Sequence, residues 1–440
     1  MAGQGAGRHE VSIERVVPGG EGLGRVGSVV ALVAGVLPGD RVAADLSPEG
    51  KRLLRGRAVE ILSPGPHRRE ESEICPRASD GTCGGCDWPA ARRDSAATLK
   101  TEIVLDALRR VGRFERADVP SPRFVSSPPN YRLRNRFHRD ADGRLGFFAP
   151  RSNRVAADLS TCEIVSKPLL SRLPAIRESL RSLGSAEGEL STLEDREGKT
   201  LLGEFRLGPG SRLENPSSLV KGAFDGLRLL DPDGRVRSED GPSALDLVAG
   251  GATFRVSVSS FFQGNRFLLD VFLEEIREAL PVARPFRALD LYAGAGFLTR
   301  PLLEIAVGAE GSVTAVEVNG SSSRDLSENL QRWEKEGFRG ARSFRATAEA
   351  FLASKALPGS VDSFDVVVAD PPRAGLSPHV RRALARMRPR TLLMVSCDPP
   401  TLARDLGAIR EAYGIERLTL LDLFPGTHHI ETVALLSRRT

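Results

Sequence analysis

One cysteine of this 440-residue chain is placed where a thiol would be reactive. Cys397 follows the apolar run "TLLMVS" and precedes "DPPTLARDL", so we expect it between the end of a strand and the start of a helix. The partial positive charge at a helix N-terminus lowers the pKa of a thiol and favours the thiolate. A cysteine in an apolar core is usually inert, and only this context favours a nucleophile at Cys397.

Two carboxylates are expected close to this thiol. Asp370 ends the run "FDVVVA", and Glu431 begins the run "ETVALLS". A thiolate can add to an electron-poor ring carbon, and a carboxylate can then remove a proton from the product. Cys397, Asp370 and Glu431 therefore predict covalent catalysis. His428 and His429 could compete as the base, although histidines near a hairpin turn are more often simply exposed.

A glycine-rich turn, "DLYAGAG", indicates where an adenosyl ligand would bind. Gly294 and Gly296 allow a tight turn and close approach of a ligand at a helix N-terminus. Glu317 ends the next expected strand and could accept hydrogen bonds from two ribose hydroxyls, a solvated carboxylate being the alternative. No Walker-type lysine follows the glycines, which argues against a nucleoside triphosphate. S-adenosylmethionine and a nicotinamide cofactor remain, and Cys397 favours the first because hydride transfer needs no thiol.

The elements that must position these residues alternate regularly from Phe286 onward. The expected strands are "RALDLYA", "SVTAVEV", "RSFRAT", "FDVVVAD", "TLLMVSC", "IERLTLLDLF" and "ETVALLS". Helical segments separate the first six, which predicts a doubly wound α/β sheet. The last two strands are joined only by "PGTHHI", too short for a parallel crossover, so we expect an antiparallel hairpin at or near one edge. In such sheets ligands bind at the carboxyl ends of the parallel strands, where Asp370, Cys397 and Glu431 all fall.

The residues before this sheet predict two further domains. Residues 11–63 contain four or five short strands broken by glycine turns, which predict a small β-barrel of the oligonucleotide-binding kind over residues 1–64. Residues 65–260 show a mixed pattern, and we expect an α+β central domain there. Its helical segment, residues 91–112, should pack on the catalytic domain, residues 261–440.

Six motifs in a fixed order resemble a known family. They are "FFQGN" (Phe261–Asn265), "DLYAGAG", "AVEVN", "DPPRAG", "VSCDPPTLARDL" and "FPGTHHIETVALL". Together they are similar to the RNA 5-methyluridine methyltransferases over the whole expected catalytic domain. The N-terminal residues resemble a TRAM domain, the small RNA-binding barrel fused to many members that modify large-subunit ribosomal RNA. The resemblance implies methyl transfer from S-adenosylmethionine to carbon 5 of a uridine, in 23S ribosomal RNA, with transfer RNA as the alternative substrate.

The resemblance also implies roles for individual residues. Cys397 would add to carbon 6 of uracil, Glu431 would remove the carbon-5 proton, and Asp370 would hold the uracil edge or orient the site. The residues that would contact S-adenosylmethionine or shape its pocket are Gln263, Tyr292, Gly294, Gly296, Glu317 and Asp370. Many relatives have Cys at the position of Ala293 and Asn at that of Phe297. Neither change touches the chemistry, but Phe297 would alter one cofactor contact.

The other four cysteines indicate a metal site. They are Cys75, Cys83, Cys86 and Cys162. Three of them fall in "CPRASDGTCGGC", too close together to be unrelated. Four thiolates suit zinc or an iron–sulfur cluster, and the spacing leaves both open because there is no second C-x-x-C pair. The family resemblance implies a [4Fe-4S] cluster with a structural or RNA-contacting role, since the proposed methyl transfer contains no redox step.

The composition is compatible with a polyanionic partner, because the net charge is +5. The segment "NYRLRNRFHR" interleaves Tyr131 and Phe137 with arginines, which predicts phosphate contacts and base stacking, with a solvated basic strand as the alternative. The longest apolar run, Val29–Leu37, is too short to cross a bilayer, and residues 1–10 have no apolar signal core. We expect a cytoplasmic protein without membrane contact, and a monomer.

Two other functions fit part of the pattern. An iron–sulfur protein that kept a methyltransferase fold would bind RNA and transfer nothing, but the complete set of Asp370, Cys397 and Glu431 argues against it. An enzyme that methylates an exocyclic nitrogen typically carries an aromatic residue after Asp-Pro-Pro. This chain has Arg373 at that position, and nitrogen methylation needs no thiol.

Overall fold

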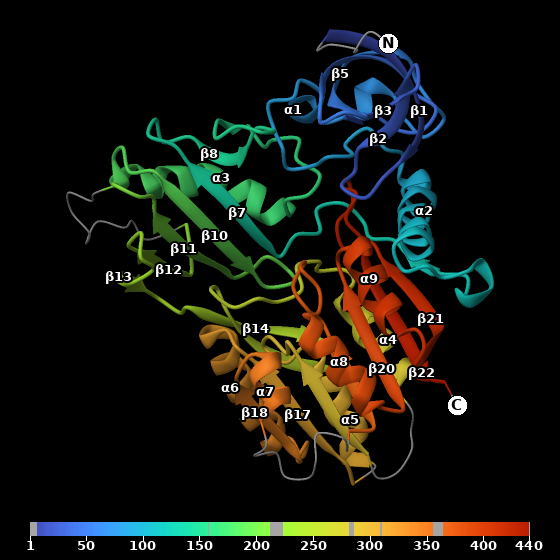
Figure 1. The fold of residues 1–440 in the computed structure, drawn as a ribbon. Coiled ribbons are helices and arrows are strands. Elements are labelled where there is room, and N and C mark those ends of the chain that lie inside the picture. The colour runs from blue at the N-terminus through green and yellow to red at the C-terminus, as the bar shows by residue number, and fades with distance from the viewer. Residues whose placement is uncertain are drawn as a thin grey trace.

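The computed structural model describes residues 7–156, 158–211, 223–280, 286–308, 310–354 and 364–439. The described strands form a closed five-stranded barrel, a seven-stranded sheet, a two-stranded sheet and an eight-stranded sheet. Figure 1 shows the barrel and the two large sheets as three lobes, with the N-terminus at the barrel and the C-terminus at the eight-stranded sheet. Along the chain, the barrel comes first, a mixed α+β part second and an α/β part last.

The first lobe is a barrel whose strands alternate buried and exposed side chains. Its strands are β1 (Gly7–Val16), β2 (Gly22–Val26), β3 (Val29–Ala34), β4 (Arg41–Pro48) and β5 (Leu53–Ser63). They pair in the order β1-β2-β3-β5-β4, and β4 pairs back with β1, which closes the barrel. Val11, Val33 and Val42 fill its core. Gly56 lets β5 pass close to β4, because a Cβ there would lie 1.8 Å from the Asp45 carbonyl oxygen.

A linking segment joins the barrel to the third lobe. It contains η1 (Glu71–Glu73), α1 (Pro76–Ser79), α2 (Arg93–Arg110), η2 (Arg116–Asp118) and β6 (Arg123–Val125). α2 buries Ile103 and Leu108 and packs against α9 (Pro399–Ile409) of the third lobe. The two helices approach closely where α2 ends, because a Cβ on Gly407 would lie 2.8 Å from the Gly112 carbonyl oxygen.

The second lobe is a seven-stranded sheet in the order β13-β12-β11-β10-β7-β8-β9. Its strands are β7 (Arg134–Arg139), β8 (Leu145–Phe148), β9 (Val155–Ala156), β10 (Gly188–Glu194), β11 (Leu201–Leu207), β12 (Gly226–Leu230) and β13 (Val236–Asp240). α3 (Lys167–Ser179) and η3 (Leu180–Leu183) cover one face. Their apolar side chains share a core with Phe137 and Phe205 from that face of the sheet.

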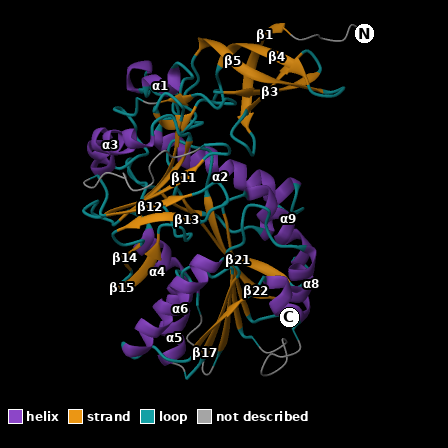
Figure 2. Cartoon of the chain, turned by 90° about the vertical axis from the view of Figure 1, so that its left-hand side faces the viewer, coloured by secondary structure: helices purple, strands orange, loops and turns teal. Residues whose placement is uncertain are grey.

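The third lobe is an eight-stranded sheet in the order β18-β17-β16-β19-β20-β22-β21-β6. Besides β6 its strands are β16 (Arg287–Leu291), β17 (Ser312–Glu317), β18 (Ala341–Arg345), β19 (Val366–Ala369), β20 (Thr391–Ser396), β21 (Tyr413–Leu421) and β22 (Glu431–Arg438). β16 to β20 run parallel. Helices cover both faces, which is why most of these strands are continuous apolar runs (Figure 2).

The helices of this lobe alternate with the parallel strands β16 to β20 as the sequence pattern predicted, with α4 before the first of them. They are α4 (Leu269–Ala279), α5 (Thr299–Gly308), α6 (Gly320–Lys335), α7 (Ala348–Ala353), α8 (Pro378–Met387) and α9. The two-stranded sheet, β14 (Ala244–Ala249) and β15 (Ala252–Ser257), packs on α4 and α6 and joins the same core. None of the helices in the described ranges is long and apolar enough to cross a membrane.

The last two strands form the hairpin predicted from their short connection. β22 lies between β20 and β21 and is antiparallel to both, with Thr432 opposite Ser396. The hairpin is therefore near the edge, and β6, which pairs parallel with β21, is the edge strand itself. This order brings the start of β22 beside the end of β20, on the rim where the parallel strands end.

Candidate active site

The side chain of Glu317 binds the glycine-rich turn after β16 to the end of β17. The Glu317 carboxylate accepts a 2.8 Å hydrogen bond from Gly294 N in the turn and a 2.6 Å hydrogen bond from Asn319 N after β17. Tyr292 and Gly294 have φ angles of 64° and 56°. For a tyrosine this left-handed conformation costs of order 1–3 kcal/mol and persists only where the surroundings impose it. Each Glu317 oxygen can accept a further hydrogen bond, which leaves capacity for ribose hydroxyls.

The two glycines meet different requirements. A Cβ on Gly296 would lie 2.9 Å from Leu326 Cδ1, so close packing on α6 requires glycine there. A Cβ on Gly294 would meet nothing closer than 3.9 Å, so this position borders open space and lets a ligand approach the backbone. Phe297 lies within an aromatic core cluster, so its ring is not available for the cofactor contact considered from the sequence.

Two carboxyl groups with raised pKa values lie at the ends of β16 and β19. Asp290 is fully buried and accepts a 2.5 Å hydrogen bond from Thr299 Oγ1. Burial raises the pKa of Asp290 to about 7, and enclosure by the protein raises the pKa of Asp370 to about 7. Gln263 Nε2 donates to Asp370 Oδ2 at 3.3 Å, which joins the "FFQGN" motif to the strand-end carboxyl.

Cys397 and Glu431 lie at neighbouring strand ends. Cys397 follows β20 directly, is half-buried, and precedes Asp398, whose side chain caps α9 by accepting a 2.9 Å hydrogen bond from Thr401 N. Glu431 begins β22 and is 4% exposed. Within the described ranges its Oε1 has no hydrogen-bond partner. A buried carboxylate oxygen without a partner beside a thiol is an arrangement that a substrate group can complete.

The pKa of Cys397 differs in direction from the sequence expectation. Burial raises it to about 11, the neighbouring carboxyls of Glu431 and Asp370 add to the rise, and Arg373 opposes it. This direction is opposite to the one expected from the helix N-terminus, because burial, the largest cause, disfavours the charged thiolate. The pKa of Glu431 is also raised, by burial first and Asp370 second, with Arg373 again opposing.

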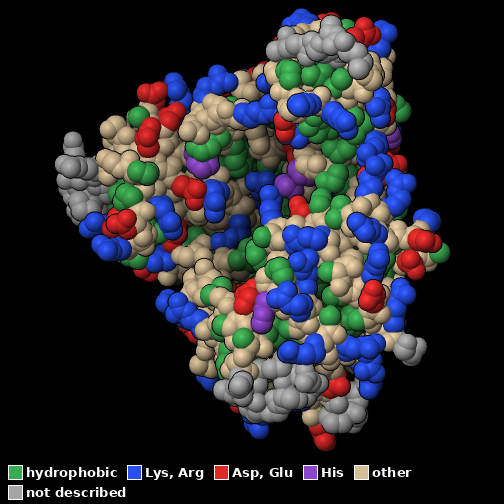
Figure 3. Space-filling model, in the orientation of Figure 1, with side chains coloured by type: hydrophobic (Ala, Val, Ile, Leu, Met, Phe, Trp, Pro, Cys, Tyr) green, Lys and Arg blue, Asp and Glu red, His purple; other side chains and the backbone are tan. Residues whose placement is uncertain are grey.

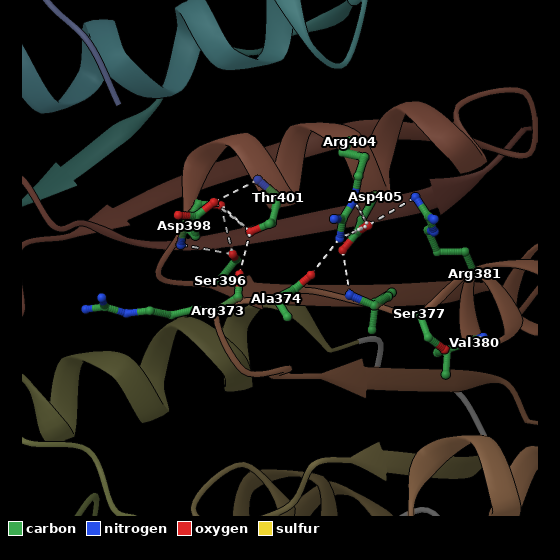
Figure 4. Close-up of polar contacts among 11 residues, drawn as sticks. Arg373, Ala374, Ser377, Val380, Arg381, Ser396, Asp398, Thr401, Arg404 and Asp405 are labelled. Atoms are coloured by element: carbon green, nitrogen blue, oxygen red, sulfur yellow. Dashed lines mark hydrogen bonds and ion pairs between the residues drawn. The ribbon is translucent and has the colours of Figure 1, made fainter. Parts of the chain in front are cut away.

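α9 holds the loop after β19 that carries Arg373 (Figure 4). Thr401 Oγ1 donates to the Arg373 carbonyl oxygen at 3.2 Å, and Arg404 Nη2 donates to the Ala374 carbonyl oxygen at 2.8 Å. Asp405 accepts a 2.7 Å hydrogen bond from Leu376 N. One helix thus fixes both the segment around Cys397 and the loop after β19.

The two histidines before Glu431 are held rather than freely exposed. His428 N donates to Asp87 Oδ1 at 2.9 Å, and its ring is hydrogen-bonded to the other oxygen of Asp87. His429 Nε2 lies 3.2 Å from Arg373 Nη2. Burial first, and His428 and Arg373 next, lower the pKa of His429 to about 4, so its ring is neutral at pH 7.

The structure adds three residues that the sequence analysis did not assign to the site. Arg373 contacts His429 and opposes the raised pKa values of Cys397 and Glu431. Phe261, in the "FFQGN" motif, is 64% exposed, and its carbonyl oxygen lies 3.9 Å from the position that a Cβ on Gly294 would take. Lys100 reaches the segment before Glu431 from α2. The helical pattern of residues 91–112 does not indicate this contact between Lys100 and the segment before Glu431.

The basic segment of residues 130–139, before and within β7, does not expose the aromatic rings on which RNA bases were predicted to stack. Tyr131 and Phe137 are fully buried, so the prediction that bases stack on these two rings is wrong. Within β7 alternate residues point to opposite faces, and Phe137 faces the core. Tyr131 precedes the strand and is buried in the same core cluster. The opposite face carries Arg136, and His138 stacks on Phe148 at 3.6 Å between ring centroids. Figure 3 shows a hollow between the three lobes with Lys and Arg side chains on its floor.

The four remaining cysteines line one cavity of about 60 Å³. Burial raises the pKa values of the Cys83, Cys86 and Cys162 thiols, which a bound cation would reverse. As the side chains stand, no three His, Cys, Asp or Glu residues in the described part of the chain surround a common metal position. The donor set suits a thiophilic metal centre, and ligation would require these side chains to turn toward one point.

The fold and the site by themselves indicate a class of enzyme. A doubly wound sheet, a glycine-rich turn after its first strand and an acidic residue ending the second are typical of α/β enzymes that bind an adenosyl group. The tRNA (uracil-54, C5)-methyltransferase of Pyrococcus abyssi, solved with S-adenosyl-L-homocysteine, has a similar fold. The TM-score is 0.71 over 97% of this chain and 100% of that chain, at 22% sequence identity.

Sequence relatives define the family. Residues 245–439 match the family described as tRNA (uracil-5-)-methyltransferase. A Streptomyces coelicolor protein described as an uncharacterized RNA methyltransferase is 31% identical over 97% of this chain and 92% of its own length. One from Streptomyces avermitilis, described in the same way, is 30% identical over 97% and 98%. The chain therefore belongs to the RNA (uracil-5-)-methyltransferase family of enzymes, which confirms the resemblance carried by the motifs.

Proposed function

We propose that this protein transfers a methyl group from S-adenosylmethionine to carbon 5 of a uridine in RNA through a covalent intermediate on Cys397. The observation that supports this most directly is the meeting of Cys397 and Glu431 at adjacent ends of β20 and β22, with Asp370 at the end of β19. The turn around Gly294 and Glu317 would hold the adenosyl part, with Tyr292 and Gln263 shaping the pocket.

The chemistry follows from the order in which these groups act. The Cys397 thiolate adds to carbon 6 of uracil. Carbon 5 of the resulting enolate attacks the methyl group of S-adenosylmethionine, whose carbon–sulfur bond breaks and releases S-adenosylhomocysteine. The Glu431 carboxylate then accepts the carbon-5 proton, the C–H electron pair restores the C5–C6 double bond, and the thiolate leaves. Arg373 supports both anions, since its charge opposes the raised pKa values of Cys397 and Glu431.

The target base must be unstacked for Cys397 to reach carbon 6. We propose 23S ribosomal RNA as the substrate, because the N-terminal residues resemble a TRAM domain and form a closed barrel, and transfer RNA is the second candidate. The domains would be the barrel (1–64), the central domain (65–260) and the catalytic domain (261–440), acting as a cytoplasmic monomer. Elution of the purified protein in size-exclusion chromatography as an oligomer would contradict the monomer.

Mapping of 5-methyluridine identifies the substrate. RNA from a strain that lacks the gene should lose one 5-methyluridine, detected by mass spectrometry of nuclease fragments. Purified protein with S-adenosylmethionine should restore it, and Cys397→Ala should not. If the wild-type protein binds this RNA but restores no methyl group, the non-catalytic RNA-binding function replaces the proposal.

We also propose that Cys75, Cys83, Cys86 and Cys162 hold a [4Fe-4S] cluster. All four side chains line one cavity, and thiolates are the ligands that such clusters use. Anaerobically purified protein should contain about four irons per chain, and Cys162→Ala should lose them. Stoichiometric zinc without iron would contradict the assignment.

A further inference from the structure

The loop between β21 and β22 determines where Glu431 lies. It covers residues 422–430, and Glu431 follows it directly. β22 fixes the backbone of Glu431 from one side through its ladder with β20. On the other side the chain leaves the sheet, so the loop must be held by contacts outside the strand pairing.

Lys100 supplies those contacts from α2. Its side chain is fully buried, and Nζ donates hydrogen bonds of 2.6 Å to Asp422 Oδ1, 3.2 Å to the Phe424 carbonyl oxygen and 2.8 Å to the His429 carbonyl oxygen. An ammonium group has three donors, and all three are used here. Asp422 is the first residue of the loop, and His429 lies two residues before Glu431. A single ammonium group therefore ties the two ends of the loop together.

Other contacts hold the loop without joining its ends. Asp87 binds His428, Trp88 N donates to the Gly426 carbonyl oxygen at 3.0 Å, and Asn265 Nδ2 donates to the Leu423 carbonyl oxygen at 2.9 Å. In the described part of the chain, Lys100 alone has hydrogen bonds to both Asp422 and His429.

We propose that Lys100 is a positioning residue for the carboxylate of Glu431. The proposal rests on the function proposed above, in which Glu431 acts only after methyl transfer. Loss of the Lys100 ammonium group would free the loop end beside Glu431. Addition of Cys397 and methyl transfer would continue, while removal of the carbon-5 proton would slow. A buried lysine that serves only the core would instead lower both steps in proportion to the loss of folded protein.

The test separates the two steps on one RNA. The probe is total RNA from cells that lack the gene and were grown with [5-³H]uridine, incubated with S-adenosyl-[methyl-¹⁴C]methionine. Methyl transfer is the ¹⁴C that RNA gains, and proton removal is the ³H that water gains. In the wild type the two should rise together. In Lys100→Met we expect ³H release to lag ¹⁴C incorporation by about tenfold or more, with a ¹⁴C-labelled protein–RNA adduct on denaturing gels.

A second variant distinguishes the loss of positioning from a folding defect. In Lys100→Met/Asp422→Leu the buried charges are replaced together by apolar side chains, which is often neutral or stabilising. This variant should fold and show the same lag, because the hydrogen bond to the His429 carbonyl oxygen is still missing. Arg68→Met is the matched control: Arg68 forms a comparably buried ion pair with Asp40, 2.6 Å away in the barrel, and should show no lag.

The outcomes are distinct. Equal rates of ³H release and ¹⁴C incorporation in both Lys100 variants would overturn the positioning role. A lag in Arg68→Met as well would show that the effect belongs to any lost buried ion pair. Absence of ¹⁴C incorporation in the wild type would instead contradict the proposed function itself.

Discussion

At the scale of single residues, the proposed nucleophile, Cys397, and the proposed base, Glu431, are both disfavoured as anions. Burial raises the pKa values of Cys397 and Glu431, the Asp370 carboxyl adds to both shifts, and the Arg373 charge opposes both. Such clusters of displaced pKa values are common at functional sites. Two predictions separate the roles of the thiol and the carboxylate.

The first concerns Glu431, which would act after the methyl group has been transferred. Glu431→Gln leaves Cys397 able to add and carbon 5 able to take the methyl, but no carboxylate accepts the proton. We expect a covalent protein–RNA adduct on substrate RNA, seen as a band of reduced mobility on a denaturing gel. The double variant with Cys397→Ala should show no such band. If Glu431→Gln turns over at a near wild-type rate without adduct, His429 becomes the candidate base.

The second concerns the pH dependence of the thiol. Because the pKa of Cys397 is raised to about 11, the thiolate fraction should grow about tenfold per pH unit between pH 7 and 10. Alkylation by iodoacetamide, measured on the Cys397 peptide by mass spectrometry in the protein without ligands, should follow this rise. Arg373→Ala should move the curve to higher pH, since a cation that stabilises the thiolate is lost. A plateau already reached near pH 8 would contradict the raised pKa.

At the scale of elements, α9 organises the rim. Its N-terminus follows Cys397, and its side chains bind the loop after β19. Asp405 is the most buried of these side chains, at 1% exposure, and it accepts Leu376 N while facing Arg404 and Arg381. The same helix packs on α2, so the segment before the catalytic sheet and the catalytic loops share one support.

Loss of the Asp405 carboxylate should therefore weaken this support. Asp405→Ala should lower the free energy of unfolding by about 2 kcal/mol, because a buried backbone donor and two guanidinium groups lose their acceptor. Activity should fall further than stability alone explains, since the loop with Asp370 and Arg373 loosens. Arg382→Ala, an exposed change on α8, should stay within about 0.5 kcal/mol of the wild type in the same urea titration. Equal stability of the two variants would contradict the role of Asp405.

At the scale of the whole molecule, three lobes surround a hollow that carries basic side chains (Figure 3). The barrel is joined to the rest through Trp88, whose Nε1 donates to the Gly20 carbonyl oxygen at 2.8 Å, and through the pair Arg15–Asp106 at 3.0 Å. Trp88 also binds the loop before Glu431. Gly20 also lies directly against the loop before Glu431, because a Cβ there would be 2.7 Å from His428 Nδ1.

If the barrel guides RNA, its removal should act on RNA and not on the small substrate. Deletion of residues 1–64 should weaken RNA binding and flatten the dependence of log K on log salt, because fewer phosphates are neutralised. The affinity for S-adenosylmethionine, measured by calorimetry, should not change. The thermal midpoint should fall, since Trp88 loses the Gly20 acceptor. An unchanged salt slope would assign the barrel another role.

The sequence by itself determined the features that depend on local pattern. Alternating apolar and helical segments indicated the α/β sheet, glycine spacing indicated the turn at Gly294, and a short connection required the final hairpin. Because parallel strands end on one rim, these local features already brought Cys397, Asp370 and Glu431 together. Motif order was sufficient for the family.

Only the tertiary structure decided what depends on distant residues and on exclusion of water. Strand periodicity predicts that Phe137 and Arg136 point to opposite faces of β7, but only packing against α3 shows that the face with Phe137 is the buried one. The pKa of Cys397 rises because packing removes water, a quantity that no motif contains. Lys100 meets Asp422 across 322 positions of sequence, and such a contact follows from how α2 packs and not from any pattern in either segment.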